Sequence, residues 1–273
     1  MTNTMIELSP DQRHIAASLF RDYPYLRGYV AAVLSGEMGA AFVDDLDNPT
    51  VGRLTLGWPH IFAGDATRRT SEAMLKDTPS EATLIGADTA WADAFRGIWG
   101  SQLVPWKRIA FSPGDWNSKT LTVLTQQLPE GYTLKQVTNA TEVAGLTRVV
   151  DWLIDRRNYP TAEDFLNRGV AFAVEFNGQI VSGCTSYAIG GGKFDLGIAT
   201  RPEHQRRRLA QAVAARMVLY CIEHDIEPCW DAGNRTDERE TEISAALAQK
   251  LGFTNPTPYT AYIINPDRRT SVS

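Results

Sequence analysis

The sequence predicts an α/β protein built on a mixed sheet, and three observations lead to this class. Segments with strand and helix patterns alternate along the chain, which is typical of a sheet covered by helices. Asn177 and Gly178 separate two strand-like segments and predict a two-residue hairpin, so part of the sheet is antiparallel. Apolar residues make up 43% and charged residues 22% of the 273 residues, ordinary values for a globular protein.

The composition argues against several classes of function. The net charge of −5 is unlike that of nucleic-acid-binding proteins, which are normally basic. The chain has no apolar run long enough to span a membrane, and its N-terminal sequence lacks the pattern of a signal peptide. Cys184, Cys221 and Cys229 lie among apolar residues without metal-ligand spacing. We therefore expect a cytoplasmic protein without a metal site and with no nucleic-acid or membrane partner.

The N-terminal half predicts short elements and ends at a linker. Ser9 and Pro10 favour the start of a helix, because serine caps helices and proline suits their first position. Further helices are expected over 25–34 and near 119–128, and strands over 39–44, 52–56, 60–63 and 106–111. Residues 129–131, Pro-Glu-Gly, form the best candidate linker. We therefore expect an N-terminal α/β domain over 1–130 and a second domain over 131–273.

The C-terminal half predicts longer and more regular elements. Strands are expected over 133–137, 171–176, 179–188, 193–200, 228–231 and 259–264. Helices are expected over 141–156, from about 206 to 224, and over 242–251, where Gly252 ends the last one.

The two halves share a weak internal similarity at an offset of 130 residues. Residues 39–42 (Gly-Ala-Ala-Phe) align with 169–172 (Gly-Val-Ala-Phe), and in the same register Val51 meets Val181. One interpretation is a duplicated unit whose first copy has degenerated. The other is that any two amphipathic hairpins match this well, and the sequence leaves both open.

The segment 198–210 carries the strongest functional signal, because it places a strand end, a turn and a helix start in succession. A helix N-terminus has unpaired N–H groups and the positive end of the helix dipole, so it binds phosphate well. Arg206, Arg207 and Arg208 fall at this point, where the same dipole disfavours cations unless an anion is bound. The segment is thus either an anion site or a solvated basic turn.

This segment resembles the acetyl-CoA motif of the GNAT N-acetyltransferase superfamily, Gln/Arg-x-x-Gly-x-Gly/Ala after a strand. Gln205 and Ala210 match the motif, as does Leu209 between its last two positions, while Arg208 replaces the central glycine. Residues 230–234 and 244–253 resemble the closing strand, the asparagine and the Leu-Gly-Phe helix end of the superfamily. The series is most similar to the group that includes zwittermicin A resistance acetyltransferases. The resemblance covers roughly 131–264 and is weak before it.

The resemblance implies a GNAT acyl-CoA N-acyltransferase fold in the C-terminal half, with a degenerate GNAT-like N-terminal half. It also implies transfer of an acetyl group from acetyl-CoA to a primary amine of a small molecule, such as an amino-containing antibiotic or a metabolite. The residues expected to bind the cofactor are Ile198, Ala199, Thr200, Arg206, Arg207, Arg208, Leu209, Ala210, Gln211 and Asn234. Because helical dihedrals suit arginine, we expect Arg208 to differ from glycine only in bulk.

Asp195 is the first candidate for the general base, since it interrupts a run of apolar or small residues beside the expected cleft. A structural carboxylate is the alternative. The resemblance places Ala248 where many GNAT enzymes carry a tyrosine acid. Either Ser244, Tyr187 or Asp231 replaces it, or solvent protonates the thiolate that leaves. The acceptor pocket is expected to include Glu175 and Tyr159. The replacement of the tyrosine by Ala248 and of the motif glycine by Arg208 also suits a catalytically silent acyl-CoA-binding sensor, which we keep as an alternative.

Overall fold

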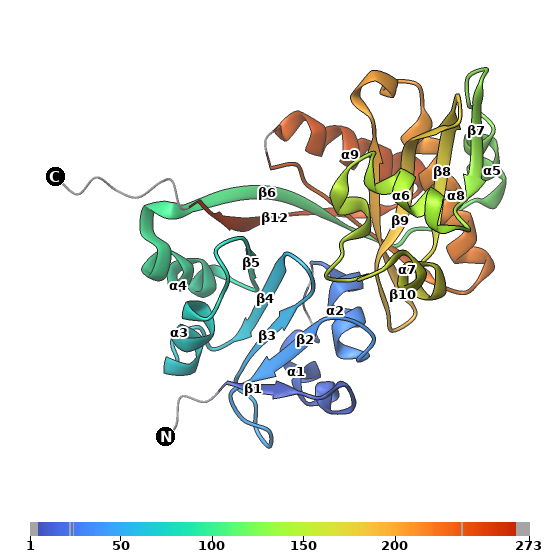
Figure 1. Cartoon of the computed structure of the whole chain (residues 1–273). Helices are drawn as coiled ribbons and strands as arrows, with labels where there is room; N and C mark the ends of the chain where they lie inside the picture. The colour runs from blue at the N-terminus through green and yellow to red at the C-terminus, as the bar shows by residue number, and fades with distance from the viewer. Residues whose placement is uncertain (1–4, 22, 24, 236, 266–273) are drawn as a thin grey trace.

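The strands of the described residues lie in one sheet that runs through both halves of the chain (Figure 1). The structure is a computed structural model that describes residues 5–21, 23, 25–235 and 237–265. The N-terminal strands are β1 (Ile6–Leu8), β2 (Ala40–Val43), β3 (Val51–Thr55), β4 (Pro59–Gly64), β5 (Thr83–Gly86) and β6 (Leu103–Ser112). The C-terminal strands are β7 (Tyr132–Gln136), β8 (Ala171–Phe176), β9 (Gln179–Gly190), β10 (Lys193–Thr200), β11 (Glu227–Ala232) and β12 (Thr254–Ile264).

Helices cover this sheet. The N-terminal ones are α1 (Ala17–Phe20), α2 (Arg27–Leu34), α3 (Arg69–Lys76), α4 (Thr89–Trp99) and α5 (Ser118–Thr125). The C-terminal ones are α6 (Ala140–Thr147), α7 (Ala162–Arg168), α8 (Leu209–Glu223) and α9 (Glu238–Leu251). No helix in the described ranges is both long and apolar enough to cross a membrane.

The two halves repeat one arrangement of elements. In each half the first four strands pair antiparallel, and the fourth pairs in parallel with the fifth: β1 to β5 in the first half and β7 to β11 in the second. A helix connects each parallel pair, but α3 has 8 residues and α8 has 15. The predicted mixed α/β class is confirmed, and the first copy is the smaller one.

The last strands of the two halves are exchanged. The sheet order is β1-β2-β3-β4-β5-β12-β6-β11-β10-β9-β8-β7, so β12 lies between β5 and β6, while β6 pairs with β11. Figure 1 shows β6 and β12 running together between the two groups of strands. The sheet is therefore continuous across the boundary predicted between residues 130 and 131, and that boundary remains a prediction.

Several predicted strands have the observed limits, and the hairpin is confirmed. β8 and β10 begin and end at the predicted residues. Asn177 and Gly178 have φ values of 48° and 74°, as a type I′ turn requires. The N-terminal helix starts as the 3₁₀ helix Pro10–Ala16, with Ser9 at its N-cap.

The helix predicted over 141–156 is wrong. α6 ends at Thr147, Val150 is extended (φ −159°, ψ 141°), and a separate 3₁₀ turn follows over Asp151–Ile154. The apolar side chains of Leu153 and Ile154 are buried all the same. The spacing of apolar residues therefore predicted correctly which side chains are buried. It did not predict the break in the helix, because two short helical segments can present their side chains to the same core.

The helix predicted from about residue 206 begins later, at Leu209. Arg206 (φ 61°) and Arg208 (φ 64°) both have left-handed backbone conformations, and Arg208 is the N-cap of α8. The expectation of helical dihedrals at Arg208 is therefore wrong. The glycine of the motif would be favoured there by backbone conformation as well as by space, because a side chain disfavours positive φ.

Helix α2 of the first half packs on strands of the second half. It contacts β9 and β10, and its residues Tyr29, Ala32 and Val33 share a core cluster with Tyr187, Ala188 and Ile189 of β9. This packing brings N-terminal residues next to the strand that carries Asp195.

Candidate active site

The strands β10 and β11 diverge after a short paired stretch. Residues 193–195 pair in parallel with residues 227–229, and no described strand pairs with this edge of β10 over residues 196–200. A register shift between Asp195 and Leu196 in the pairing with β9 marks the same point. Such a bulge bends a strand locally, so the edge of β10 beyond Asp195 is open to a ligand.

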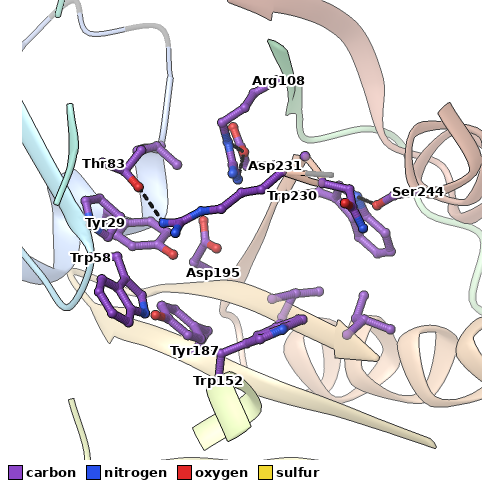
Figure 2. Close-up of a pocket in the computed structure, with 18 of the residues that line it drawn as sticks. Tyr29, Trp58, Thr83, Arg108, Trp152, Tyr187, Asp195, Trp230, Asp231 and Ser244 are labelled. Atoms are coloured by element: carbon purple, nitrogen blue, oxygen red, sulfur yellow. Dashed lines mark hydrogen bonds and ion pairs between the residues drawn. The ribbon is translucent and has the colours of Figure 1, made fainter. Parts of the chain in front are cut away.

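A cavity of about 550 Å³ opens at this divergence (Figure 2). The N-terminal half contributes Leu26, Tyr29, Trp58, Pro59, Thr83, Ile85, Trp106 and Arg108. The C-terminal half contributes Asp151, Trp152, Tyr187, Asp195, Leu196, Gly197, Ile198, Trp230, Asp231, Gly233, Asn234, Arg235, Glu240 and Ser244. Both halves therefore build one cavity, in which aromatic side chains alternate with acidic and basic ones. A concave site with apolar walls and convergent polar groups is typical of small-molecule binding.

Asp195 lies in the middle of this cavity and is 5% exposed (Figure 2). Its carboxyl group has no hydrogen-bond partner among the described residues. Burial raises its pKa well above the ordinary value, the nearby Asp231 adds to the rise, and Arg108 opposes it. A buried carboxyl group with a raised pKa in a cavity is a typical candidate for proton transfer.

Asp231 is engaged in a buried network and is not free to replace the missing tyrosine. Arg108 Nε donates to Asp231 Oδ1 at 2.5 Å, and the hydroxyl of Tyr259 donates to Asp231 Oδ2 at 2.7 Å. Although burial lowers the pKa of Arg108, the carboxylate of Asp231 raises it above the ordinary value. The network joins β6, β11 and β12 where the exchanged strands meet.

The other two predicted substitutes differ in their availability. Tyr187 donates its hydroxyl hydrogen to Asp155 Oδ2 at 3.0 Å, so this hydrogen is already bound. Ser244 lines the cavity and accepts a hydrogen bond from Trp230 Nε1 at 3.3 Å. Its own hydroxyl hydrogen has no acceptor among the described residues. Ala248 is fully buried and does not line the cavity.

The arginine-rich loop lies beyond the end of β10 and does not line the cavity. The side chains of Arg206, Arg207 and Arg208 are exposed. In the part of the chain that the structure describes, the N–H groups of residues 206–211 donate to no protein group. The φ angles are positive at Arg206 and Arg208 but not at Arg207. Such alternation turns successive N–H groups toward a common anion.

Of the predicted cofactor residues, Ile198 and Asn234 line the cavity with Asp195 and Ser244, while Ala199, Thr200 and residues 206–211 do not. Thr200 Oγ1 lies 2.7 Å from Ser182 Oγ, which also donates to the carbonyl of Ala199 at 3.1 Å. The carbonyl of Asn234 accepts from Trp106 Nε1 at 2.8 Å, which ties the loop after β11 to β6.

Two residues expected in the acceptor pocket lie elsewhere. Glu175 pairs with Lys135 at 2.6 Å on the neighbouring strand β7. Tyr159 is 1% exposed and donates to the carbonyl of Ser186 at 2.6 Å. Their predicted role in the pocket is therefore wrong, and both are structural.

The sequence interpretation missed the N-terminal residues of the cavity and Arg235. Arg235 Nη2 donates to Thr83 Oγ1 at 2.8 Å, and its guanidinium lies 5.6 Å from the ring centre of Trp58 and 5.2 Å from that of Trp106. Its position directly after Asn234 was an available signal. No such signal in the sequence pointed to Trp58 and Trp106, because only the fold brings them close to β10.

Comparisons with known proteins give a consistent result. The family model of the GNAT acetyltransferases matches residues 18–262. The uncharacterized N-acetyltransferase YdfB of Bacillus subtilis (strain 168) is 27% identical over 267 residues, which cover 94% of this chain and 97% of the relative. A crystal structure of a GCN5-related N-acetyltransferase-like protein from Streptococcus suis is 26% identical, has a TM-score of 0.79, and aligns over 94% of this chain and 99% of that one. A tandem GNAT protein from the clavulanic acid biosynthesis pathway is similar in fold alone, with a TM-score of 0.55 at 13% identity over 95% of this chain and 96% of that one.

Proposed function

Because the chain belongs to the GNAT acetyltransferase family and is an N-acetyltransferase, we propose that it transfers an acetyl group from acetyl-CoA to a primary amine of a small molecule. The observation that carries this proposal is the divergence of β10 and β11 after Asp195, which leaves a strand edge and a cavity side by side. An amino-containing antibiotic or metabolite is the acceptor class we propose, and membership of the zwittermicin A resistance group remains a prediction.

The residues beside β10 fit an acyl-CoA donor. The unpaired edge at Ile198 and Thr200 suits the amide groups of a pantetheine arm, which would add to the sheet as a short strand. The N–H groups of residues 206–211, which donate to no group in the described ranges, and the exposed side chains of Arg206 and Arg208 suit a diphosphate. When bound there, acetyl-CoA supplies an acetyl group already activated as a thioester.

Asp195 is proposed to accept the proton that an acceptor amine must lose. An amine with a pKa of about 10.4 is neutral in roughly one molecule in 2,500 at pH 7, which corresponds to about 4.6 kcal/mol. The carboxyl group of Asp195 is buried and has no hydrogen-bond partner among the described residues. An incoming ammonium group therefore stabilises its charged form, and the proton can then pass to the carboxylate, directly or through water.

Ser244 is proposed to protonate the sulfur that leaves. Its oxygen accepts a hydrogen bond from Trp230 Nε1, which fixes the side chain at the cavity wall. Its hydroxyl hydrogen has no acceptor among the described residues and can point into the cavity. Ser244 lies one helical turn before Ala248, so it replaces the tyrosine from a neighbouring position on the same helix.

Release of CoA tests the proposal. The purified chain is mixed with acetyl-CoA and a panel of small amines, and free thiol is measured against time, while calorimetry measures acetyl-CoA binding. We expect binding together with amine-dependent release of CoA and a product heavier by one acetyl group. Binding without release for every amine would favour the silent sensor, and absence of binding would refute the assignment of the donor site.

A further inference from the structure

One arginine of the cavity lacks an acidic partner among the described residues. Arg108 is paired with Asp231, and Arg157, which stacks on Trp58 at 3.6 Å, is paired with Asp155. Arg235 has no carboxylate within ion-pair distance in the described ranges. Its guanidinium is held by Thr83 Oγ1 and by the rings of Trp58 and Trp106. The described part of the protein therefore orients this exposed cation at the wall of the cavity and pairs it with no described carboxylate.

The environment of Arg235 is electropositive as well as partly buried. Burial lowers the pKa of its guanidinium, and the positive charges of Arg108 and Arg157 lower it further. The side chain is nevertheless exposed, so a ligand in solution can approach its guanidinium. A guanidinium that keeps several donors free in a fixed plane is suited to a carboxylate, which it can bind through two parallel hydrogen bonds.

The opposite charge has its own place in the same cavity. Asp195 presents a buried carboxyl group without a hydrogen-bond partner in the described ranges, and Asp151 and Glu240 add acidic groups to the lining. Trp58, Trp106 and Trp152 supply flat apolar walls that suit a carbon skeleton. The cavity thus offers a cation for a carboxylate, an acid for an ammonium group, and apolar surface around both.

We propose that the acceptor is a small aminocarboxylate, whose carboxylate pairs with Arg235 while its amine is presented to Asp195. This inference rests on the proposed function and specifies its substrate class. Arg235 binds the carboxylate and Asp195 accepts a proton from the amine, so the two residues act at different ends of one acceptor. An amine without an acid group would leave Arg235 unpaired.

The test compares amino acids with their own amides, which have nearly the same shape but no negative charge. Phenylalanine, lysine, 4-aminobutyrate and 6-aminohexanoate are each measured beside the corresponding amide by release of CoA from acetyl-CoA. For at least one pair we expect kcat/KM to be at least about 10-fold higher for the acid, since a charged hydrogen bond is lost with the amide. Equal or better turnover of every amide would overturn the inference and leave the proposed acetyl transfer intact.

Variants of Arg235 and of Arg239, which lies in the first turn of α9, assign the effect. Arg235→Gln should lower kcat/KM for the preferred acid by about 10- to 100-fold and leave its amide within about twofold. Arg239→Gln makes the same charge change at an exposed position outside the cavity and should match the wild type. Arg235→Lys, which keeps the charge but loses the planar fork, should fall between them. Equal losses for acid and amide in Arg235→Gln would overturn the inference.

A binding measurement separates this inference from the chemistry. The same acids and amides are titrated by calorimetry into the chain saturated with CoA, where no acetyl group is available. Acid binding that disappears in Arg235→Gln supports the carboxylate site even if no amine is ever acetylated, in which case only the proposed function fails. If no acid binds and none is acetylated, the inference fails.

Discussion

Gly28 of α2 lies directly against Asp195 of β10, although the two residues belong to different halves of the chain. A Cβ atom added at Gly28 would lie 2.8 Å from Cβ of Asp195 and 3.1 Å from its Oδ2. Real Cβ atoms essentially never approach other atoms at the shorter of these distances, so the helix can pack at this point only with a glycine. The N-terminal half thus fixes the position of the candidate base.

Gly28→Ala should therefore reduce turnover by displacing Asp195. We expect kcat to fall by about 10-fold or more and the free energy of unfolding to fall by about 1–3 kcal/mol, because the added methyl group overpacks the contact. Acetyl-CoA affinity, measured by calorimetry, should change little. Gly97→Ala in α4 is the control, since a Cβ atom added there would have no described atom within 4 Å, and it should leave turnover unchanged. An active Gly28→Ala variant would contradict the assignment of Asp195.

Asp195→Asn should lower turnover and raise stability at neutral pH. Burial raises the pKa of Asp195, so the folded wild type favours the protonated carboxyl group and loses stability as the pH rises above about 4, the unfolded pKa. The asparagine side chain of the variant is uncharged throughout this pH range, so its burial carries no such pH-dependent cost in stability. In urea unfolding between pH 4 and 8, the free energy of unfolding of the variant should rise relative to that of the wild type as the pH rises. The kcat of the variant should be lower by about 100-fold or more. A constant stability difference would refute the raised pKa.

Charge reversal at the loop before α8 should weaken acetyl-CoA binding. In the double variant Arg206→Glu with Arg208→Glu we expect at least about a 10-fold higher Kd by calorimetry, because two cations facing a diphosphate become anions. The fold should persist, since both side chains are exposed. Arg68→Glu with Arg69→Glu is the matched control at the start of α3, the corresponding helix of the other half. Equal Kd values for the two double variants would exclude the loop from the site.

Arg208→Gly should stabilise the fold. Because Arg208 has φ 64°, glycine removes a backbone cost of roughly 1–2 kcal/mol, partly offset by the greater freedom of glycine in the unfolded chain. We expect a net gain of up to about 1 kcal/mol in the free energy of unfolding. The same substitution at Arg207, where φ is not positive, should give no gain, and a loss at both positions would contradict the left-handed conformation.

The network of Arg108, Asp231 and Tyr259 should be costly to break from one side. Arg108→Met leaves the buried carboxylate of Asp231 without its cation, and we expect a loss of about 3–5 kcal/mol in urea unfolding. The double variant Arg108→Met with Asp231→Asn also removes the unpaired charge of Asp231, so its free energy of unfolding should fall by less. A double variant less stable than Arg108→Met alone would mean that Asp231 is not charged in the folded protein.

Most individual elements could be predicted from the sequence, because each depends on neighbouring residues. The limits of β8 and β10 follow from alternating apolar residues, and the hairpin between β8 and β9 follows from Asn177 and Gly178. The break at Val150 and the start of α8 at Leu209 could not be predicted in this way. Apolar spacing records which side chains are buried, and it does not record the φ of Val150 or Arg208.

The candidate site could be predicted only on its C-terminal side. Asp195, Ile198, Asn234 and Ser244 come from a segment with recognisable motifs, and the structure brings all four to one cavity. The lining residues from the N-terminal half, such as Trp58 and Trp106, reach the cavity only because of the way the two halves of the sheet join. That arrangement rests on pairing between strands more than a hundred residues apart, as for β6 with β11, which no local pattern encodes.

The exchange of β6 and β12 has a consequence for how the chain matures during synthesis. β12 is inserted between β5 and β6, so the sheet of the first half stays incomplete until residues 254–264 have left the ribosome. A chain cut before Thr254 would lose a central strand of the sheet rather than an edge strand. The aromatic residues of the N-terminal half and the candidate base of the C-terminal half therefore come together only when both halves have been made.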